Sequence, residues 1–127
     1  MSWTVRLHDI FEKEFESLPQ EVQDEMLAMA KLLKDYGPRL GRPHADTLNG
    51  SAYANMKELR FQAADGVWRV AFAFDPQREA ILLFAGDKSG GSEEKFYKRL
   101  LKKADERYRQ HFQNLQSLIA QRGKRGK

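Results

Sequence analysis

Three short apolar segments separated by two turns constrain the fold of this chain more than any other feature. They span residues 57–62, 67–74 and 80–84, and their residue types favour β-strands. Asp65-Gly66 lies between the first two segments, and an Asp-Gly pair at such a place is a strong hairpin signal. Residues 75–78 form the second turn. The stretch therefore predicts three consecutive antiparallel strands, a β-meander.

The middle strand carries an arginine among small and apolar residues. Because side chains alternate across a strand, its large apolar residues should share one face. These residues are Trp68, Val70, Phe72 and Phe74. Arg69 falls on the other face with Val67, Ala71 and Ala73. That face is either a shallow platform with a fixed cation or simply the solvent side of a two-layer sheet.

Helical patterns flank the meander on both sides. Residues 3–7 alternate as a short strand, and Asp9 could cap a first helix. A second helix should begin at Pro19 and end at Gly37-Pro38. A long loop is expected over residues 37–53.

A last helix is expected from Glu93 to Ile119, packed on an edge or on the opposite face of the sheet. The element order β-α-α-β-β-β-α indicates an α+β fold, in which a helical hairpin packs on a small antiparallel-meander sheet and a long C-terminal helix follows. We expect one domain over residues 1–116. Residues 117–127 should form a basic, disordered tail.

Composition narrows the functional classes. The chain has 127 residues, a net charge of +4 and no cysteine, which excludes disulfides and thiolate metal sites. We see no secretory signal and no apolar run long enough to span a membrane, so we expect a cytoplasmic protein without membrane contact. Residues 1–36 are net acidic and the remainder is net basic. Such charge asymmetry is typical of a protein that binds nucleic acid, but a solvent-exposed face or binding to an acidic protein would explain it equally.

Candidate chemistry is limited to a group of cations on or beside the meander. His8, His44 and His111 have no metal-ligand spacing, and no glycine-rich phosphate loop opens a helix. Arg60 and Arg69 should share one sheet face, and Lys88 follows the third strand.

An aromatic residue could complete this group, because Tyr97 can approach from the last helix. Cations around a phosphate, with an aromatic ring on which a base can stack, suit RNA cleavage by a 2′-hydroxyl. The alternative is that Arg60 has no catalytic role and only forms a salt bridge on the protein surface. Further phosphate contacts are possible from five other basic residues: Lys57, Arg39, Arg42, Lys95 and Arg99.

Four motifs resemble the RelE/ParE toxin superfamily, and most closely its HigB-type, phage-related branch. They are KELRF, WRVAFAFD, LLFAGDKSG and FYKRLLKKADERY, and the resemblance covers roughly residues 3–115. It implies a small RelE-like α+β toxin of a type II toxin–antitoxin system that cleaves mRNA in the ribosomal decoding site without a metal or other cofactor. It also implies a cognate antitoxin, usually a helix-turn-helix protein of the HigA type.

The resemblance implies a role for each residue of the group. Arg69 matches the hairpin arginine that binds the scissile phosphate, and Arg60 matches the basic position of the preceding strand. Lys88 occupies the position of a general acid or phosphate ligand. Tyr97, or alternatively Phe96, occupies the position of the aromatic residue that stacks on or orients the nucleotide. Glu58 stands where RelE-type enzymes carry a lysine, so no general base is assigned.

Three functional interpretations remain open from the sequence. The first is a ribosome-dependent mRNA endonuclease that inhibits translation. The second is a ParE-like toxin that poisons gyrase and shares the fold but not the catalytic cations. The third is a catalytically inert domain that binds nucleic acid or protein. The joint presence of Arg60, Arg69 and Lys88 favours the nuclease, although a fold does not determine a function.

Overall fold

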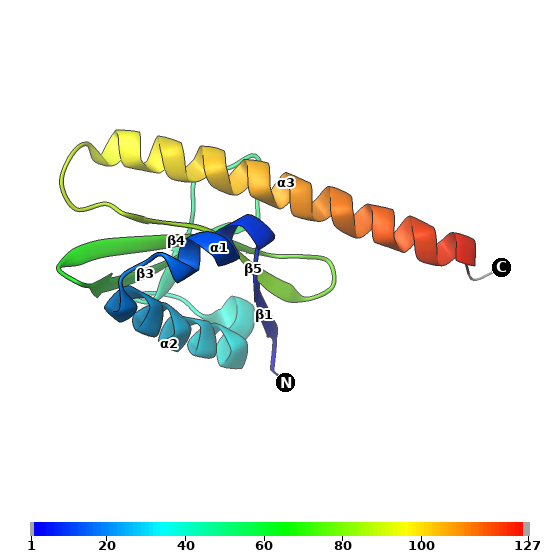
Figure 1. The fold of residues 1–127 in the computed structure, drawn as a ribbon, viewed down its shortest axis with the longest axis horizontal. Coiled ribbons are helices and arrows are strands. Elements are labelled where there is room, and N and C mark those ends of the chain that lie inside the picture. Colours follow the sequence, from blue (N-terminus) through cyan, green and yellow to red (C-terminus); the bar gives the residue numbers. More distant parts are fainter. Residues whose placement is uncertain (1, 126–127) are drawn as a thin grey trace.

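A five-stranded sheet in the order β1-β5-β4-β3-β2 forms the centre of the computed structural model, which describes residues 2–125 (Figure 1). In chain order the elements are β1 (Thr4–Leu7), α1 (Asp9–Glu16), α2 (Gln20–Tyr36), the 3₁₀ turn η1 (Gly37–Arg39), β2 (Ala45–Thr47), β3 (Met56–Ala63), β4 (Gly66–Phe74), β5 (Glu79–Asp87) and α3 (Glu93–Arg125). The predicted α+β fold and its meander, β3-β4-β5, are confirmed. Strand β1 adds a parallel edge on β5, and β2 pairs with β3 inside the segment predicted to be loop.

The hairpin between β3 and β4 turns one residue earlier than the sequence suggested. Ala63 pairs with Gly66, so the two turn residues are Ala64 and Asp65, with φ angles of +49° and +59°. Positive φ at both positions is the pattern of a type I′ turn. Gly66 instead begins β4, where an added Cβ would lie 2.7 Å from Oδ2 of Asp87. The glycine therefore serves close packing rather than the turn.

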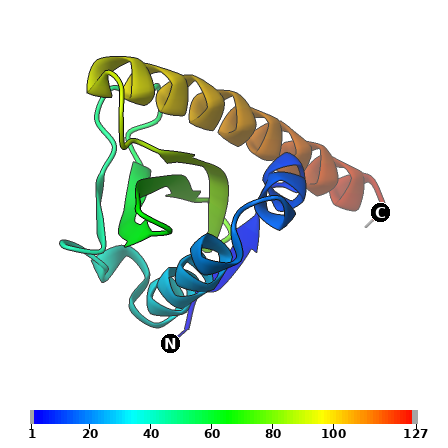
Figure 2. The same cartoon turned by 60° about the vertical axis from the view of Figure 1, so that its left-hand side comes forward.

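Each face of the sheet is covered by helix, as Figure 2 shows. The α1–α2 hairpin covers one face, and α3 crosses the other. The first core joins helix residues such as Met26 and Leu33 to Val70 and Phe72. This confirms the predicted apolar face of β4. Burying these side chains against helices supplies the main driving force for the fold.

The face expected to form an open platform is a second core over much of its area. Its members come from the sheet and from α3: Leu48, Met56, Ala71, Ala73, Ile81, Leu83, Leu100, Ala104 and Tyr108. Two alanines of β4 leave room for a helix to approach, so the small residues mark a helix-packing surface. Arg69 shares this face and is 6% exposed. The expectation of an open platform was therefore wrong.

The beginning of α1 and the end of α3 differ from expectation. His8 rather than Asp9 caps α1, because its Nδ1 accepts a hydrogen bond of 3.2 Å from the N–H of Ile10. Helix α3 continues to Arg125, through most of the segment 117–127 for which we expected disorder. Residues 126–127 lie outside the described residues. Within residues 2–125, we find no helix with the length and apolar content needed to span a membrane.

Candidate active site

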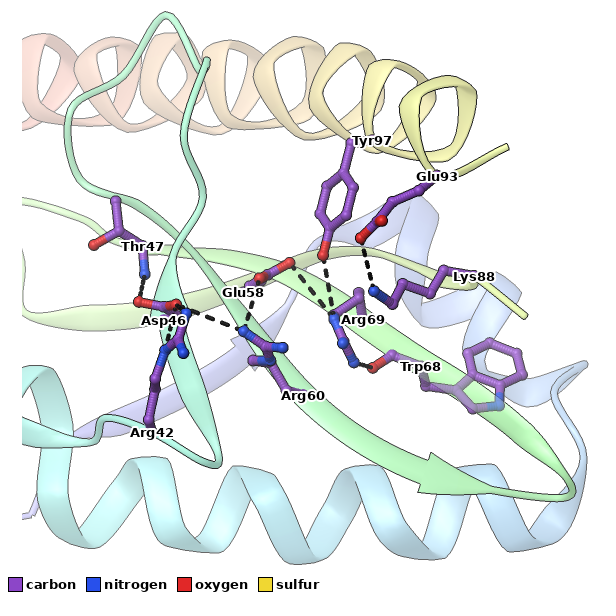
Figure 3. Close-up of polar contacts among 10 residues, drawn as sticks. All are labelled: Arg42, Asp46, Thr47, Glu58, Arg60, Trp68, Arg69, Lys88, Glu93 and Tyr97. Carbon is purple, nitrogen blue, oxygen red and sulfur yellow. Dashed lines mark hydrogen bonds and ion pairs between the residues drawn. The ribbon is translucent and has the colours of Figure 1, made fainter. Parts of the chain in front are cut away.

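Strand pairing brings the two arginines of the meander together. Arg60 of β3 lies directly opposite Arg69 of β4, and the backbone N–H of Lys88 donates to the carbonyl of Val67 at 2.7 Å. The three predicted cations therefore flank the same end of β4 (Figure 3). Like charges directly opposite on a sheet repel each other. The cluster consequently depends on the anions and dipoles around it.

Arg69 is held by three neighbouring groups. Its Nε donates to the hydroxyl of Tyr97 at 3.3 Å, and its Nη1 donates to the carbonyl of Trp68 at 2.9 Å. Oε1 of Glu58 lies 3.9 Å from the same Nε. The predicted approach of Tyr97 from the last helix is thus present in the structure. It also means that α3 covers part of the Arg69 guanidinium.

Glu58 is the residue of this site that the sequence did not single out as functional. It is 5% exposed, and its Oε2 lies 3.9 Å from Nη1 of Arg60. Burial raises the pKa of the Glu58 carboxyl, whereas the Tyr97 hydroxyl and the guanidiniums of Arg69 and Arg60 act in the opposite direction. The available signal was the spacing of two between Glu58 and Arg60, which places both side chains on one face.

Lys88 approaches the cluster from the side opposite Arg60. Its Nζ contacts Oε1 of Glu93 at 2.9 Å and lies 5.8 Å from the centre of the Tyr97 ring. The ion pair with Lys88 lowers the pKa of the Glu93 carboxyl. Tyr97 therefore contacts both Lys88 and Arg69. The structure brings together all four residues predicted to act in catalysis.

The other predicted RNA-binding residues divide between the margin of the cluster and more distant surfaces. Arg42 forms an ion pair of 2.7 Å with Asp46, whose carboxylate also lies 3.6 Å from Nη1 of Arg60. The hydrogen bond from Arg42 is the main reason that the pKa of Asp46 is lowered. Asp46 thus links Arg42 to Arg60 at the margin of the cluster.

The remaining four basic residues are not drawn into the cluster by any contact among residues 2–125. Nζ of Lys57 lies 3.5 Å from the carbonyl of Pro38. Arg99 lies over the ring of Phe84, at 5.6 Å from its centre. Arg39 and Lys95 are exposed.

No group of three or more potential metal ligands gathers among the described residues. His111 instead contacts Asp75 at 2.8 Å, Nε2 to Oδ2. His8, His111, Glu79 and other residues line a cavity of about 460 Å³. Because Glu79 begins β5 while Lys88 follows its end, this cavity lies away from the cation cluster.

Comparison with known families decides where this chain belongs. The family model described as "Phage derived protein Gp49-like" matches residues 13–109, which is most of the chain. The chain belongs to the Gp49-like family. Among relatives of this Gp49-like chain, the Mycobacterium tuberculosis protein named "Putative toxin HigB2" is 40% identical over 112 residues, which cover 87% of the chain and 55% of HigB2. "Putative toxin HigB3" of the same organism is 46% identical over 79 residues, covering 62% of the chain and 68% of HigB3.

Solved structures agree with the predicted RelE-like fold of the Gp49-like chain. A mutant of E. coli toxin RelE in the free state matches with a TM-score of 0.57 and 12% identity, covering 81% of the chain and 97% of RelE. The archaeal RelE-RelB complex from Pyrococcus horikoshii contains a chain that matches with a TM-score of 0.52 and 19% identity, covering 72% and 100% respectively. The predicted resemblance to RelE- and HigB-type proteins is thereby confirmed. The Gp49-like chain spans only about half the length of HigB2.

Proposed function

We propose that this protein is the toxin of a type II toxin–antitoxin module and cleaves ribosome-bound mRNA without a metal ion. The observation that carries the proposal is the gathering of Arg60, Arg69, Lys88 and Tyr97 at one end of β4. The toxin names of the HigB relatives and the RelE-like fold support the same class. Translation would stop because the message is cut during decoding.

The proposed reaction is an attack of a ribose 2′-hydroxyl on the adjacent phosphodiester. The O2′–P bond forms and the P–O5′ bond breaks, which leaves a 2′,3′-cyclic phosphate and a 5′-hydroxyl. The 2′-hydroxyl proton passes to a water molecule, since no side chain is assigned as the general base. Arg60 and Arg69 stabilise the negative charge that develops on the phosphorane. Lys88 donates a proton to the departing 5′-oxygen, and Tyr97 stacks on a base to orient the nucleotide.

The exposed side chains of the cluster determine where RNA would bind. The side chain of Arg60 is 28% exposed and that of Lys88 is 20% exposed, whereas Arg69 is nearly buried. Nη2 of Arg69 has no hydrogen-bond partner among residues 2–125, so this nitrogen is the donor through which Arg69 would reach a phosphate. Arg42 would then hold a neighbouring phosphate beside Arg60.

A helix-turn-helix antitoxin of the HigA type is the proposed protein partner, and the cytoplasm is the proposed site of action. The solved RelE-RelB complex, which matches this fold, supports the expectation of a protein partner. Expression of the chain alone should stop growth, and co-expression of the adjacent antitoxin gene should restore it.

The decisive experiment measures cleavage of a defined mRNA on purified ribosomes. Arg69→Ala and Arg60→Ala should each lower the rate by on the order of 10²–10³, because each removes a group that stabilises transition-state charge. Arg109→Ala, an exposed change on α3, is the matched control and should cleave at the wild-type rate. In cells that express the protein, intact mRNA together with double-strand DNA breaks would instead identify a gyrase poison. Full toxicity of a folded Arg69→Ala variant would refute the nuclease.

A further inference from the structure

Glu58 lies between two arginines of the cluster but has no part in the reaction proposed above. Its two carboxylate oxygens divide between the arginines, with Oε1 at 3.9 Å from Nε of Arg69 and Oε2 at 3.9 Å from Nη1 of Arg60 (Figure 3). Both separations permit electrostatic attraction but are too long for hydrogen bonds. Oε1 has no hydrogen-bond partner among residues 2–125 and is shielded from solvent.

Such an arrangement is unfavourable for folding and therefore requires an explanation. A buried carboxylate without a full set of donors loses hydration that nothing replaces. Four groups face it: Asp46 from β2, Arg60 from β3, Arg69 from β4 and Tyr97 from α3. Only the two arginines carry positive charge, and they are direct cross-strand neighbours that repel each other. The carboxylate is placed where it can attract both.

We propose that Glu58 is a positioning residue that holds Arg60 and Arg69 as a pair facing one phosphodiester while leaving the Arg60 guanidinium and Nη2 of Arg69 free to bind it. This inference rests on the proposed function and adds the device that pre-arranges its cations. At hydrogen-bond distance the carboxylate would occupy Nη1 of Arg60, a donor that a phosphate needs, and would compete with the Tyr97 hydroxyl for Nε of Arg69. At 3.9 Å it offsets the repulsion between the guanidiniums without occupying them.

Replacing the carboxylate by a neutral group of the same shape separates binding from rate. In Glu58→Gln the cluster is one unit more positive, so RNA should bind as tightly as to the wild type or more tightly. The two guanidiniums lose their common anchor, and small misplacements of catalytic groups can cost on the order of 10²-fold in rate. We expect a large fall in the single-turnover rate with an unchanged or lower half-saturating concentration.

Acid pH should reproduce the effect of this substitution in the wild type. Because burial raises the pKa of the Glu58 carboxyl, protonation occurs at a higher pH than for an exposed glutamate. The wild-type cleavage rate should therefore decrease as the pH falls below neutrality. Glu58→Gln should lack this acid limb of the pH–rate profile. A carboxyl with a raised pKa favours folding at low pH, and this contribution is lost as pH rises through the folded-state pKa. Glu58→Gln should therefore unfold at the same or a higher temperature than wild type at neutral pH.

The experiment combines single-turnover cleavage of ribosome-bound mRNA across pH with thermal unfolding. Glu79→Gln is the matched control, because it removes one carboxylate at the far end of β5 and leaves the cluster intact. A reduced rate, a lost acid limb and undiminished thermal stability in Glu58→Gln alone support the proposal. A wild-type rate, or a reduced rate accompanied by lower thermal stability and weaker RNA binding, would overturn it.

A binding measurement keeps the inference separate from the proposed function. If wild-type protein cleaves no mRNA, the nuclease proposal fails, and an RNA carrying a 2′-deoxy residue serves as the ligand. Arg60→Ala and Arg69→Ala should then show coupled losses of affinity in the wild-type background and additive losses in the Glu58→Gln background. Additive losses in both backgrounds would refute the pairing of the arginines by Glu58.

Discussion

Arg107 connects α3 to both α1 and β5, and its removal should be strongly destabilising. Nη1 donates to Oε1 of Glu14 at 2.6 Å and to the carbonyl of Leu83 at 2.8 Å, and Nη2 donates to Oε2 of Glu14 at 2.7 Å. The guanidinium also lies 5.2 Å from the centre of the Phe84 ring. One buried side chain thus holds three elements together.

The expected cost of Arg107→Ala follows from these contacts. Removing one partner of a fully buried ion pair costs about 3–5 kcal/mol, because the other charge stays unpaired. The side chain of Glu14 is 40% exposed, so solvent screening reduces this ion-pair contribution to about 1 kcal/mol. The buried carbonyl of Leu83 loses its donor, which adds about 1–3 kcal/mol. We expect the free energy of unfolding to fall by about 2–4 kcal/mol in total.

Urea unfolding at neutral pH measures this quantity directly. Arg109→Ala, on the exposed side of the same helix, is the control and should change stability by less than about 0.5 kcal/mol. The hydrogen bond from Arg107 lowers the pKa of the Glu14 carboxyl. A carboxyl with a lowered pKa adds stability at neutral pH, and this contribution is lost as pH falls through its folded-state pKa. The difference in the free energy of unfolding between wild type and Arg107→Ala should therefore become smaller at acid pH. A loss below about 1 kcal/mol at neutral pH would refute the reasoning.

Two further substitutions test the turns of the meander. Ala64→Gly should raise the free energy of unfolding by about 0.5–1 kcal/mol, because Ala64 has a φ of +49° that glycine adopts without steric cost; an unchanged or lower urea midpoint would contradict this. Asp75→Ala should lower it by about 2–4 kcal/mol, because the Asp75 carboxylate accepts from the N–H groups of Gln77 and Glu79 and contacts His111. A thermal unfolding temperature close to wild type would show that these contacts contribute little.

The meander and its facing pattern could be predicted from sequence because they depend on local properties. Alternation along β4 assigned Val70 and Phe72 to one face and Arg69 to the other, and strand parity placed Arg60 with Arg69. The hairpin position was displaced by one residue, since Asp-Gly predicts a turn but not its register. Ala64 takes the strained turn position, whereas Gly66 lies where an added Cβ would come within 2.7 Å of Oδ2 of Asp87 and 2.8 Å of Nε1 of Trp68.

The sequence left two places for the last helix, an edge or the opposite face of the sheet, and only the tertiary structure decided that α3 covers the face. The packing of α3 on Ala71 and Ala73 joins segments that are far apart in the chain, and no local pattern specifies the face that a distant helix selects. That packing buries Arg69, brings Tyr97 to its Nε and removes Glu58 from water. In the sequence, Glu58 looks like an ordinary strand residue, but in the folded protein it is a buried anion. The energetic cost of its charge depends on access to solvent, which its neighbours in sequence do not determine.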